Sequence, residues 1–256
     1  MPASRFVWYE LMTSDAPAAL DFYKQVVGWN SQDSGMPGGV YTLMMVGDAQ
    51  VAGVMQTPDE LKAVGAPSEW SGYIAVDDVD AMAARVLAAG GKVLRPPEDI
   101  PGDIGRFAVV ADPQNAAFVL FKPSRNDPPA MPPAEAPGTV GWHELRATDG
   151  AAVFDFYATL FGWKKGEGLD MGPMGTYQLF EIDGVPSGAV MTKEPDAPMP
   201  GWRYYFRVDA IDAAVERVRR LGGAVTMGPS EVPGGLWVAQ ARDPQGAVFA
   251  LMSAKK

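Results

Sequence analysis

The chain has 256 residues, of which 47% are hydrophobic, and it carries a formal net charge of −10 and no cysteine. This length and apolar content are sufficient for two domains with buried cores, whereas the negative charge argues against nucleic acid and anionic membranes as partners. The missing cysteines exclude disulfides, cysteine–zinc sites and thiol nucleophiles. Because the N-terminal segment lacks the apolar core of a signal peptide, we expect a cytoplasmic protein.

The first elements of the chain follow from its residue pattern. Residues 6–12 alternate in polarity and predict a strand, and Ser14 or Asp15 caps a helix that has Pro17 in its first turn and ends at Gly28. Three shorter strand-like stretches follow. A second unit begins with the strand "GYIAV", continues with a helix over residues 79–89, and ends in a hairpin that turns at "DPQN". The pattern therefore predicts strand, helix and three strands, twice over.

The second half of the chain repeats the first. Residues 7–29 recur at 141–163, the segment from residue 72 recurs 132 residues later, and "ADPQNAAFVLF" recurs as "RDPQGAVFALM" at 242–252. A repeat of this kind indicates duplicated structural units. We therefore predict one domain over 1–122, a second over 139–256, and a stiff proline-rich linker over 123–138.

This order of motifs resembles the vicinal oxygen chelate superfamily, which contains glyoxalase I, bleomycin resistance proteins and extradiol dioxygenases. The opening strand with "D…FY…GW", the "VDD" or "VDA" step from strand to helix, and the "DPQ" hairpin carry the resemblance in both halves. It implies an α+β fold of tandem glyoxalase-like domains. Each domain would consist of two βαβββ modules that form a half-open, curved, mixed sheet, with the helices outside and a small-molecule cup inside.

Metal-dependent members of this superfamily hold a divalent cation with His, Gln and Glu side chains at three strand positions. The resemblance places residues there that cannot replace those ligands, and Arg203 would repel a cation. We therefore expect no metal and no other cofactor. The six residues at these positions are Trp8, Ser71 and Val119 in the first half and Trp142, Arg203 and Ala250 in the second.

His143 is the single histidine of the chain, and it lies between Trp142 and Glu144. Side chains on a strand alternate between two faces, so if Trp142 faces the cup, His143 faces the helix with Leu145. A metal role would also require further imidazole or thiolate donors, which the chain lacks. We therefore expect His143 to be a packed histidine with one hydrogen bond.

The same alternation predicts which side chains line the two cups. Aromatic walls with a few polar groups are typical of small-molecule sites, although these bulky residues could equally fill the cavity. Proline- and glycine-rich loops at 96–105 and 228–235 would edge the cups. The candidate ligand-binding residues are Trp8, Glu10, Ser71, Tyr73 and Val119 in the first domain, and Trp142, Glu144, Arg146, Arg203, Tyr205, Arg207 and Ala250 in the second.

We consider three functions for this sequence. The first is a metal-free protein that binds a small apolar or aromatic molecule. The second is a metal-independent lyase, isomerase or biosynthetic hydroxylase in which Glu144 is the base and Arg203 and Tyr205 assist, unless Glu144 only forms an ion pair with arginine. The third, a divalent-metal glyoxalase or dioxygenase, lacks its ligands. Since four modules in one chain complete two cups, we expect a monomer or weak homodimer.

Overall fold

A computed structural model describes residues 4–36, 41–124, 131–195, 197 and 199–256. Its contacts divide the chain into two compact units that do not coincide with the two repeats. Unit 1 comprises the described residues of 1–8, 71–127 and 142–203, and unit 2 comprises those of 9–70, 128–141 and 204–256. Unit 1 therefore combines the second module of the first repeat with the first module of the second repeat. Unit 2 combines the first module of the first repeat with the second module of the second repeat.

Unit 2 contains the first and the last module of the chain. The first consists of β1 (Phe6–Thr13, whose residues 6–8 belong to unit 1), α1 (Ala16–Val27), β2 (Asn30–Asp33), β3 (Tyr41–Val46) and β4 (Ala49–Gln56), followed by the short helix α2 (Asp59–Ala63). The last consists of β13 (Gly201–Arg207, whose residues 201–203 belong to unit 1), α5 (Ile211–Arg220), β14 (Ala224–Val232), β15 (Leu236–Arg242) and β16 (Val248–Ser253). Their strand orders are β2-β3-β4-β1 and β14-β15-β16-β13.

Unit 1 contains the two middle modules. One consists of β5 (Glu69–Ala75), α3 (Val79–Ala88), β6 (Lys92–Ile100), β7 (Gly105–Ala111) and β8 (Ala117–Pro123). The other consists of β9 (Val140–Ala147), α4 (Gly150–Phe161), β10 (Lys164–Asp170), a 3₁₀ turn (Gly172–Met174), β11 (Thr176–Ile182) and β12 (Val185–Thr192). Their strand orders are β6-β7-β8-β5 and β10-β11-β12-β9.

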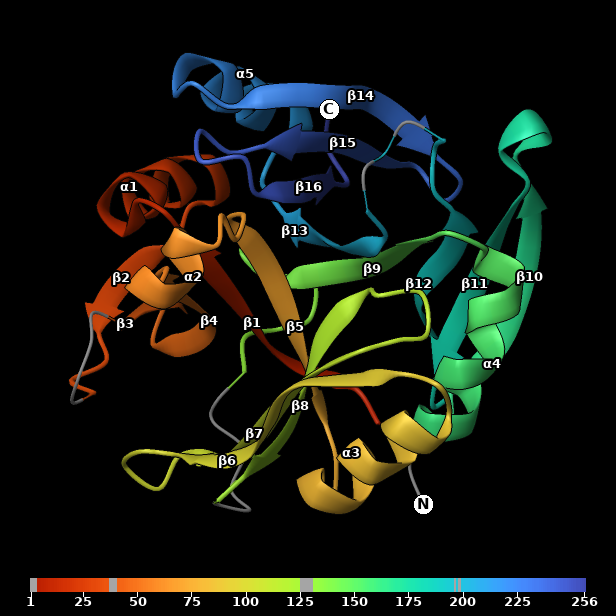
Figure 1. The fold of residues 1–256 in the computed structure, drawn as a ribbon. Coiled ribbons are helices and arrows are strands. Elements are labelled where there is room, and N and C mark those ends of the chain that lie inside the picture. Colours follow the sequence, from red (N-terminus) through yellow and green to blue (C-terminus); the bar gives the residue numbers. More distant parts are fainter. Residues whose placement is uncertain (1–3, 37–40, 125–130, 196, 198) are drawn as a thin grey trace. The chain divides into compact units, whose positions relative to one another are not determined.

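All four modules share one topology, which confirms the predicted βαβββ units. The opening strand of each module pairs in parallel with its closing strand, and the other neighbours are antiparallel. Figure 1 shows one long helix in each module lying against the sheet of that module. The fold is α+β with mixed sheets, as the sequence predicted. Among the described residues, no helix is both long and apolar enough to cross a membrane.

The helix ends are set by the residues that the sequence pattern indicated. Asp15 is the N-cap of α1, and its carboxylate accepts a hydrogen bond from the Ala18 amide at 3.1 Å. Asp149 caps α4 in the same way through the Ala152 amide at 3.0 Å. Gly28 ends α1 with φ at 90°, a left-handed conformation that favours glycine.

Aromatic and aliphatic side chains fill the space between each helix and its sheet. In the last module Tyr204, Phe206 and Phe249 are fully buried, and Tyr23 of α1 meets the rings of Phe206 and Phe249 edge-on, whereas Arg207 of β13 is partly exposed. Alternation along the strands therefore separates a helix-facing core from a second, more polar face. That second face carries the candidate site.

Two buried tyrosine–aspartate hydrogen bonds join the repeats inside the units. In unit 1 the Tyr157 hydroxyl, on α4, donates to Asp112 Oδ2 at 3.0 Å, and Asp112 belongs to the "DPQN" turn. In unit 2 the Tyr23 hydroxyl, on α1, donates to Asp243 Oδ2 at 3.1 Å, and Asp243 belongs to the "DPQG" turn. Burial raises the pKa of both carboxyl groups. The "FY" and "DPQ" motifs of different repeats are thus contact partners.

Two predictions about connecting segments need correction. The stretches 96–105 and 228–235 are not simple loops, because β6 extends to Ile100 and β14 to Val232. Both are terminal strands of their sheets, where a proline can be accommodated because one edge needs no partner. Residues 125–130 of the predicted linker lie outside the described residues. The described part turns rather than running straight, since the Ala136 amide donates to Pro133 and Trp29 Nε1 donates to the Gly138 carbonyl at 2.8 Å.

Candidate functional site

The alternation along β9 is the one that the sequence predicted. His143, Leu145 and Ala147 are buried on one face, and Trp142 and Arg146 are partly exposed on the other. Glu144 shares the face of Trp142 and Arg146, yet it is only 2% exposed. A carboxylate enclosed to this degree requires polar partners, because burying an unpaired charge is costly.

Three hydrogen bonds hold the Glu144 carboxylate, and a fourth fixes one of their donors. Arg146 Nε donates to Oε1 at 2.7 Å, and Arg203, from the first half of β13, donates to the same oxygen at 3.0 Å. The Tyr177 hydroxyl, from β11, donates to Oε2 at 3.0 Å. Trp142 Nε1 in turn donates to the Tyr177 hydroxyl at 2.9 Å. We call the set Trp142, Glu144, Arg146, Tyr177, Glu194 and Arg203 the Glu144 cluster, and all of it belongs to unit 1.

The two arginines of the cluster are bonded differently. Arg146 also donates from NH1 to Glu194 at 2.7 Å, and the Glu194 side chain is 45% exposed at the rim. Arg203 is 17% exposed, and its buried Nε has no hydrogen-bond partner among the described residues. The guanidinium of Arg146 therefore donates hydrogen bonds to two carboxylates, whereas Arg203 keeps its Nε–H donor without an acceptor among the described residues.

His143 is a structural residue, as expected. Its Nδ1 lies 2.7 Å from the Ser187 carbonyl oxygen, and its ring stacks on Phe6 with centroids 4.2 Å apart. Burial lowers the pKa of His143 to about 4. The imidazole is therefore neutral at physiological pH and packed in the core.

Three other candidates of the second repeat lie in unit 2. Arg207 pairs with Glu135 at 2.9 Å, on the chain segment that precedes β9. The Tyr205 hydroxyl accepts a hydrogen bond from Gln240 Nε2 at 2.9 Å, and Tyr205 pairs across the sheet with Ala250. These contacts give Arg207 and Tyr205 partners within their own unit.

The candidates of the first repeat are divided between the units. Tyr73 pairs with Val119 across β5 and β8 in unit 1, and its ring meets Phe121 edge-on. Trp8 and Ser71 also belong to unit 1, whereas Glu10 pairs with Gly53 in unit 2. Arg106, on β7, the strand next to β8, pairs with Asp80 at 2.7 Å and Asp99 at 3.0 Å. Its hydrogen bonds to Asp80 hold the pKa of that carboxyl below its usual value.

The comparisons with known proteins agree with this topology. The sequence profile of the Glyoxalase/Bleomycin resistance protein/Dioxygenase superfamily matches residues 5–120 and 139–251. The chain belongs to this superfamily. It is 34% identical over 251 residues to "Putative glyoxylase CFP32" of Mycobacterium tuberculosis, covering 96% of this chain and 93% of that one.

Two further relatives of the superfamily extend the comparison. The anthracycline biosynthesis protein DnrV of Streptomyces peucetius is 35% identical over 266 residues, which cover 97% of this chain and 93% of DnrV. The Mn(II)-bound glyoxalase from Novosphingobium aromaticivorans superposes with a TM-score of 0.65 at 16% identity, covering 100% of this chain and 83% of that one. At that identity the superposition shows a shared fold only.

The residues of this superfamily member do not fit the metal site of its metal-dependent relatives. Tryptophan, serine or arginine, and valine or alanine occupy the expected ligand positions. Within the part of the chain that the structure describes, no three His, Cys, Asp or Glu side chains gather to hold an ion. The buried carboxylate of the cluster, Glu144, is bonded to two guanidinium groups, which would repel a cation. We therefore derive no metal-assisted step.

Sequence reasoning identified four members of the cluster and missed Tyr177 and Glu194. Tyr177 had a detectable signal, because the repeats align it with Tyr41 at the start of the equivalent strand. Glu194 lies beyond β12 and outside the repeated blocks, so no pattern indicated it.

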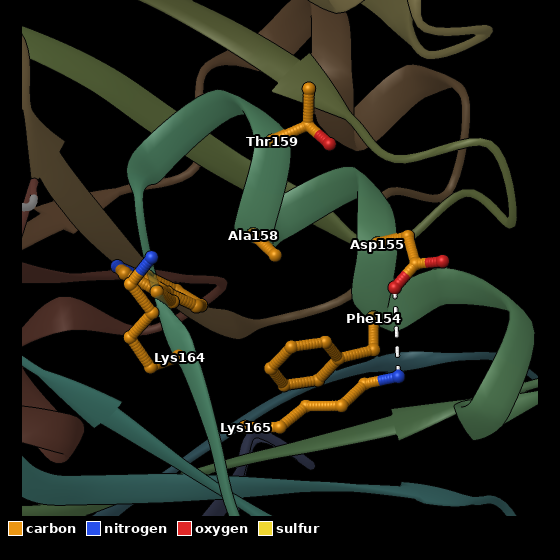
Figure 2. A pocket seen from close by; sticks show the side chains of 7 residues that line it. Phe154, Asp155, Ala158, Thr159, Lys164 and Lys165 are labelled. Carbon is orange, nitrogen blue, oxygen red and sulfur yellow. Dashed lines mark ion pairs between the residues drawn. The ribbon is translucent and has the colours of Figure 1, made fainter.

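A shallow pocket of about 360 Å³ also lies on unit 1, and Figure 2 shows its lining along α4 and the start of β10. Lys165 closes part of it, because its ammonium lies 3.5 Å from Asp155 and 5.0 Å from the centroid of the Phe154 ring. The lining contains no residue of the Glu144 cluster. It consists of Phe154, Asp155, Ala158, Thr159, Trp163, Lys164 and Lys165.

Proposed function

We propose that this chain is a metal-independent member of the superfamily that binds a small, planar, apolar or aromatic molecule at the Glu144 cluster. The observation that carries the proposal is the position of Arg203, whose guanidinium donates to Glu144 from a place where the resemblance puts a metal ligand. A cation and a guanidinium would compete for the same carboxylate. The cluster is therefore organised for an organic ligand.

The exposed part of the cluster supports this proposal. Trp142 is partly exposed, and its Nε1 is fixed by the Tyr177 hydroxyl, so its ring is held in one orientation. An indole held in this way offers a large apolar face for stacking at little cost in conformational entropy. The neighbouring arginines supply directional donors to a polar group of the ligand.

The relatives support an aromatic compound as the ligand. DnrV is named for anthracycline biosynthesis, and it aligns with 97% of this chain. Anthracyclines contain fused planar rings with carbonyl and phenol oxygens. A planar tricyclic quinone is therefore a suitable probe for the Glu144 cluster.

The geometry favours binding over base catalysis by Glu144. Its Oε1 accepts hydrogen bonds from Arg146 and Arg203, and its Oε2 accepts one from Tyr177. A base has to present a free lone pair to the proton that it removes, in hydrogen-bond reach of the substrate. The three hydrogen bonds to this carboxylate instead hold the two arginines in place.

The test is the binding of anthraquinone-2-carboxamide to protein treated with EDTA, measured by isothermal titration calorimetry. We expect binding with the same affinity, within about twofold, before and after addition of Mn²⁺, Zn²⁺ or Ni²⁺. Trp142→Ala should weaken binding by about tenfold, the loss expected for one aromatic contact. Trp237→Ala, which removes an indole from β15 in unit 2, is the matched control and should leave the affinity unchanged.

Two results would overturn this proposal. The first is the presence of one tightly bound divalent ion per chain in protein purified without chelator. The second is binding that depends on added metal or is insensitive to Trp142→Ala.

A further inference from the structure

We propose that the ligand of the Glu144 cluster is an aromatic acid, and that its ionised oxygen, a carboxylate or a phenolate, pairs with the guanidinium of Arg203. This inference deepens the function proposed above and rests on it. It makes Arg203 the residue that determines specificity for an acidic group.

The first argument is the donor count at Arg203. A guanidinium has five N–H donors, and the hydrogen bond that the structure gives Arg203 is the one from NH1 to Glu144 at 3.0 Å. Its Nε is buried and has no acceptor among the described residues. Arg146, in contrast, directs Nε and NH1 to two carboxylates. An acceptor supplied by the ligand would satisfy donors of Arg203 that the protein leaves open.

The second argument is the charge balance of the cluster. The buried carboxylate of Glu144 faces two guanidinium groups, of which Arg146 is 13% exposed and Arg203 is 17% exposed. The second carboxylate, Glu194, is 45% exposed and pairs with Arg146. The four charged groups of the cluster sum to zero, whereas its enclosed part, one carboxylate and two guanidinium groups, has one positive charge in excess. A negative oxygen placed there compensates that charge, and charge-assisted hydrogen bonds to a guanidinium are strong and directional.

The third argument comes from the first repeat, which serves as an internal comparison. Glu10 pairs with Gly53 as Glu144 pairs with Ala189, so the two glutamates hold equivalent sheet positions. Trp142, Glu144 and Tyr177 have counterparts of the same type in the first repeat, but the two arginines of the cluster do not. The counterparts are Trp8, Glu10 and Tyr41, with Met12 and Ser71 at the positions of Arg146 and Arg203.

It follows that the fold of a module does not require an arginine at either position. The arginine pair is specific to the second repeat, on a face that is partly open to solvent. A residue that the fold does not need, held in place by a buried carboxylate, is typical of a binding group.

The test compares two probes that differ in one group. Anthraquinone-2-carboxylate and anthraquinone-2-carboxamide have the same ring system, and only the first is charged at neutral pH. We expect calorimetry to show that the native protein binds the acid about ten times or more as tightly as the amide, since hydrogen bonds between charged groups exceed neutral ones by this order.

Three variants assign the preference to Arg203. Arg203→Ser introduces the residue of the first repeat and should lower the affinity for the acid by about tenfold or more, a larger loss than it causes for the amide. Arg203→Lys keeps the charge and should retain part of the preference for the acid. Arg219→Ser removes a 52% exposed arginine of α5 and should change neither affinity.

The outcomes separate the two proposals. If the native protein binds acid and amide equally, or if Arg203→Ser weakens both to the same extent, the inference about the aromatic acid is wrong while the proposed function stands. If neither probe binds at millimolar concentration, the proposed function fails, and the inference fails with it. The comparison of the two probes on the native protein remains decisive if Arg203→Ser does not fold.

Discussion

The two tyrosine–aspartate hydrogen bonds are related by the repeat, but they are not equivalent. Tyr23 accepts an additional hydrogen bond from Trp70 Nε1 at 2.8 Å, so it links an aspartate and an indole. Trp202 stands at the corresponding place in the second repeat and meets Tyr157 edge-on, yet its buried Nε1 has no hydrogen-bond partner among the described residues. Removal of the two hydroxyl groups should therefore have unequal effects.

The magnitudes follow from the number of bonds that each substitution removes. Tyr157→Phe removes one buried hydrogen bond to a carboxylate, and we expect a loss of about 1.5–3 kcal/mol in the free energy of unfolding. Tyr23→Phe removes the same kind of bond and also leaves the buried Trp70 N–H without its acceptor, which costs about 1–3 kcal/mol more. Tyr23→Phe should thus be the more destabilising of the two.

Thermal unfolding at pH 7, followed by circular dichroism and calorimetry, measures both effects. For a chain of this size we expect the Tm to fall by about 2–4 °C for each kcal/mol, so the two variants should differ by several degrees. The double variant Tyr23→Phe/Trp70→Phe should lose less than the sum of the single effects, because the two residues share a hydrogen bond. An equal loss in both single variants, or a larger loss for Tyr157→Phe, would refute the reasoning.

A pH series provides a second check on the same bond. Burial raises the pKa of Asp112 above its ordinary value of 3.8, and the Tyr157 hydrogen bond opposes that rise because it favours the ionised form. The contribution of the hydroxyl is fully present while Asp112 is ionised and declines as the pH falls through the raised pKa. The difference in Tm between the native protein and Tyr157→Phe should accordingly shrink between neutral pH and pH 4.

The remaining predictions concern the single histidine, the buried carboxylate and the joining of the repeats. The pKa of His143 is about 4 in the folded state against 6.5 ordinarily, so the stability of the folded protein should be highest above pH 6.5 and should fall by about 3 kcal/mol as the pH decreases to 4. His143→Gln should abolish that part of the pH dependence of stability. An NMR titration of His143 with a midpoint near 6.5 would contradict this prediction. Glu144→Gln leaves Arg203 without a carboxylate and Arg146 with Glu194 alone, and it should cost about 3–5 kcal/mol in urea unfolding. A second substitution, Arg203→Ser, should recover a part of this loss, and additive losses would show that the pair is not coupled. Two separately expressed chains, one ending at Ser124 and one beginning at Met131, should fold only when mixed and should then co-elute in size-exclusion chromatography, because each unit draws on both repeats.

Local residue patterns predicted the elements of this fold well. The cap at Asp15, the stop at Gly28 and the turn at Asn115, whose φ is 76°, lie where residue chemistry requires them. The strand prediction for residues 6–12 differs from β1 by one residue. Such features depend on neighbours in the chain, which a sequence displays directly.

The site was predictable only as far as strand alternation extends. Alternation placed Trp142, Glu144 and Arg146 on one face of β9, and the superfamily resemblance placed Arg203 at a ligand position. Tyr177 reaches Glu144 from β11, which is separated from β9 by β12, so its contribution depends on the register of three strands. No pattern in a single strand contains that information.

The pairing of modules within each unit could not be predicted for a related reason. Hydrophobic periodicity defines each βαβββ module, but all four modules present similar apolar faces. The choice of partner depends on long-range contacts such as Tyr157 with Asp112 and the paired hydrogen bonds between Gln114 and the backbone of Asp149. These residues are more than thirty positions apart in the chain, beyond the range of any periodicity.

Each of the two units combines modules from both repeats, and this arrangement limits which changes the chain tolerates. Neither repeat supplies a complete hydrophobic core, so loss of either copy would expose half of both units rather than leave one intact. In this chain the two copies stand in one polypeptide, so each supplies what the other lacks without an encounter between molecules, and one copy carries arginines where the other has Met12 and Ser71.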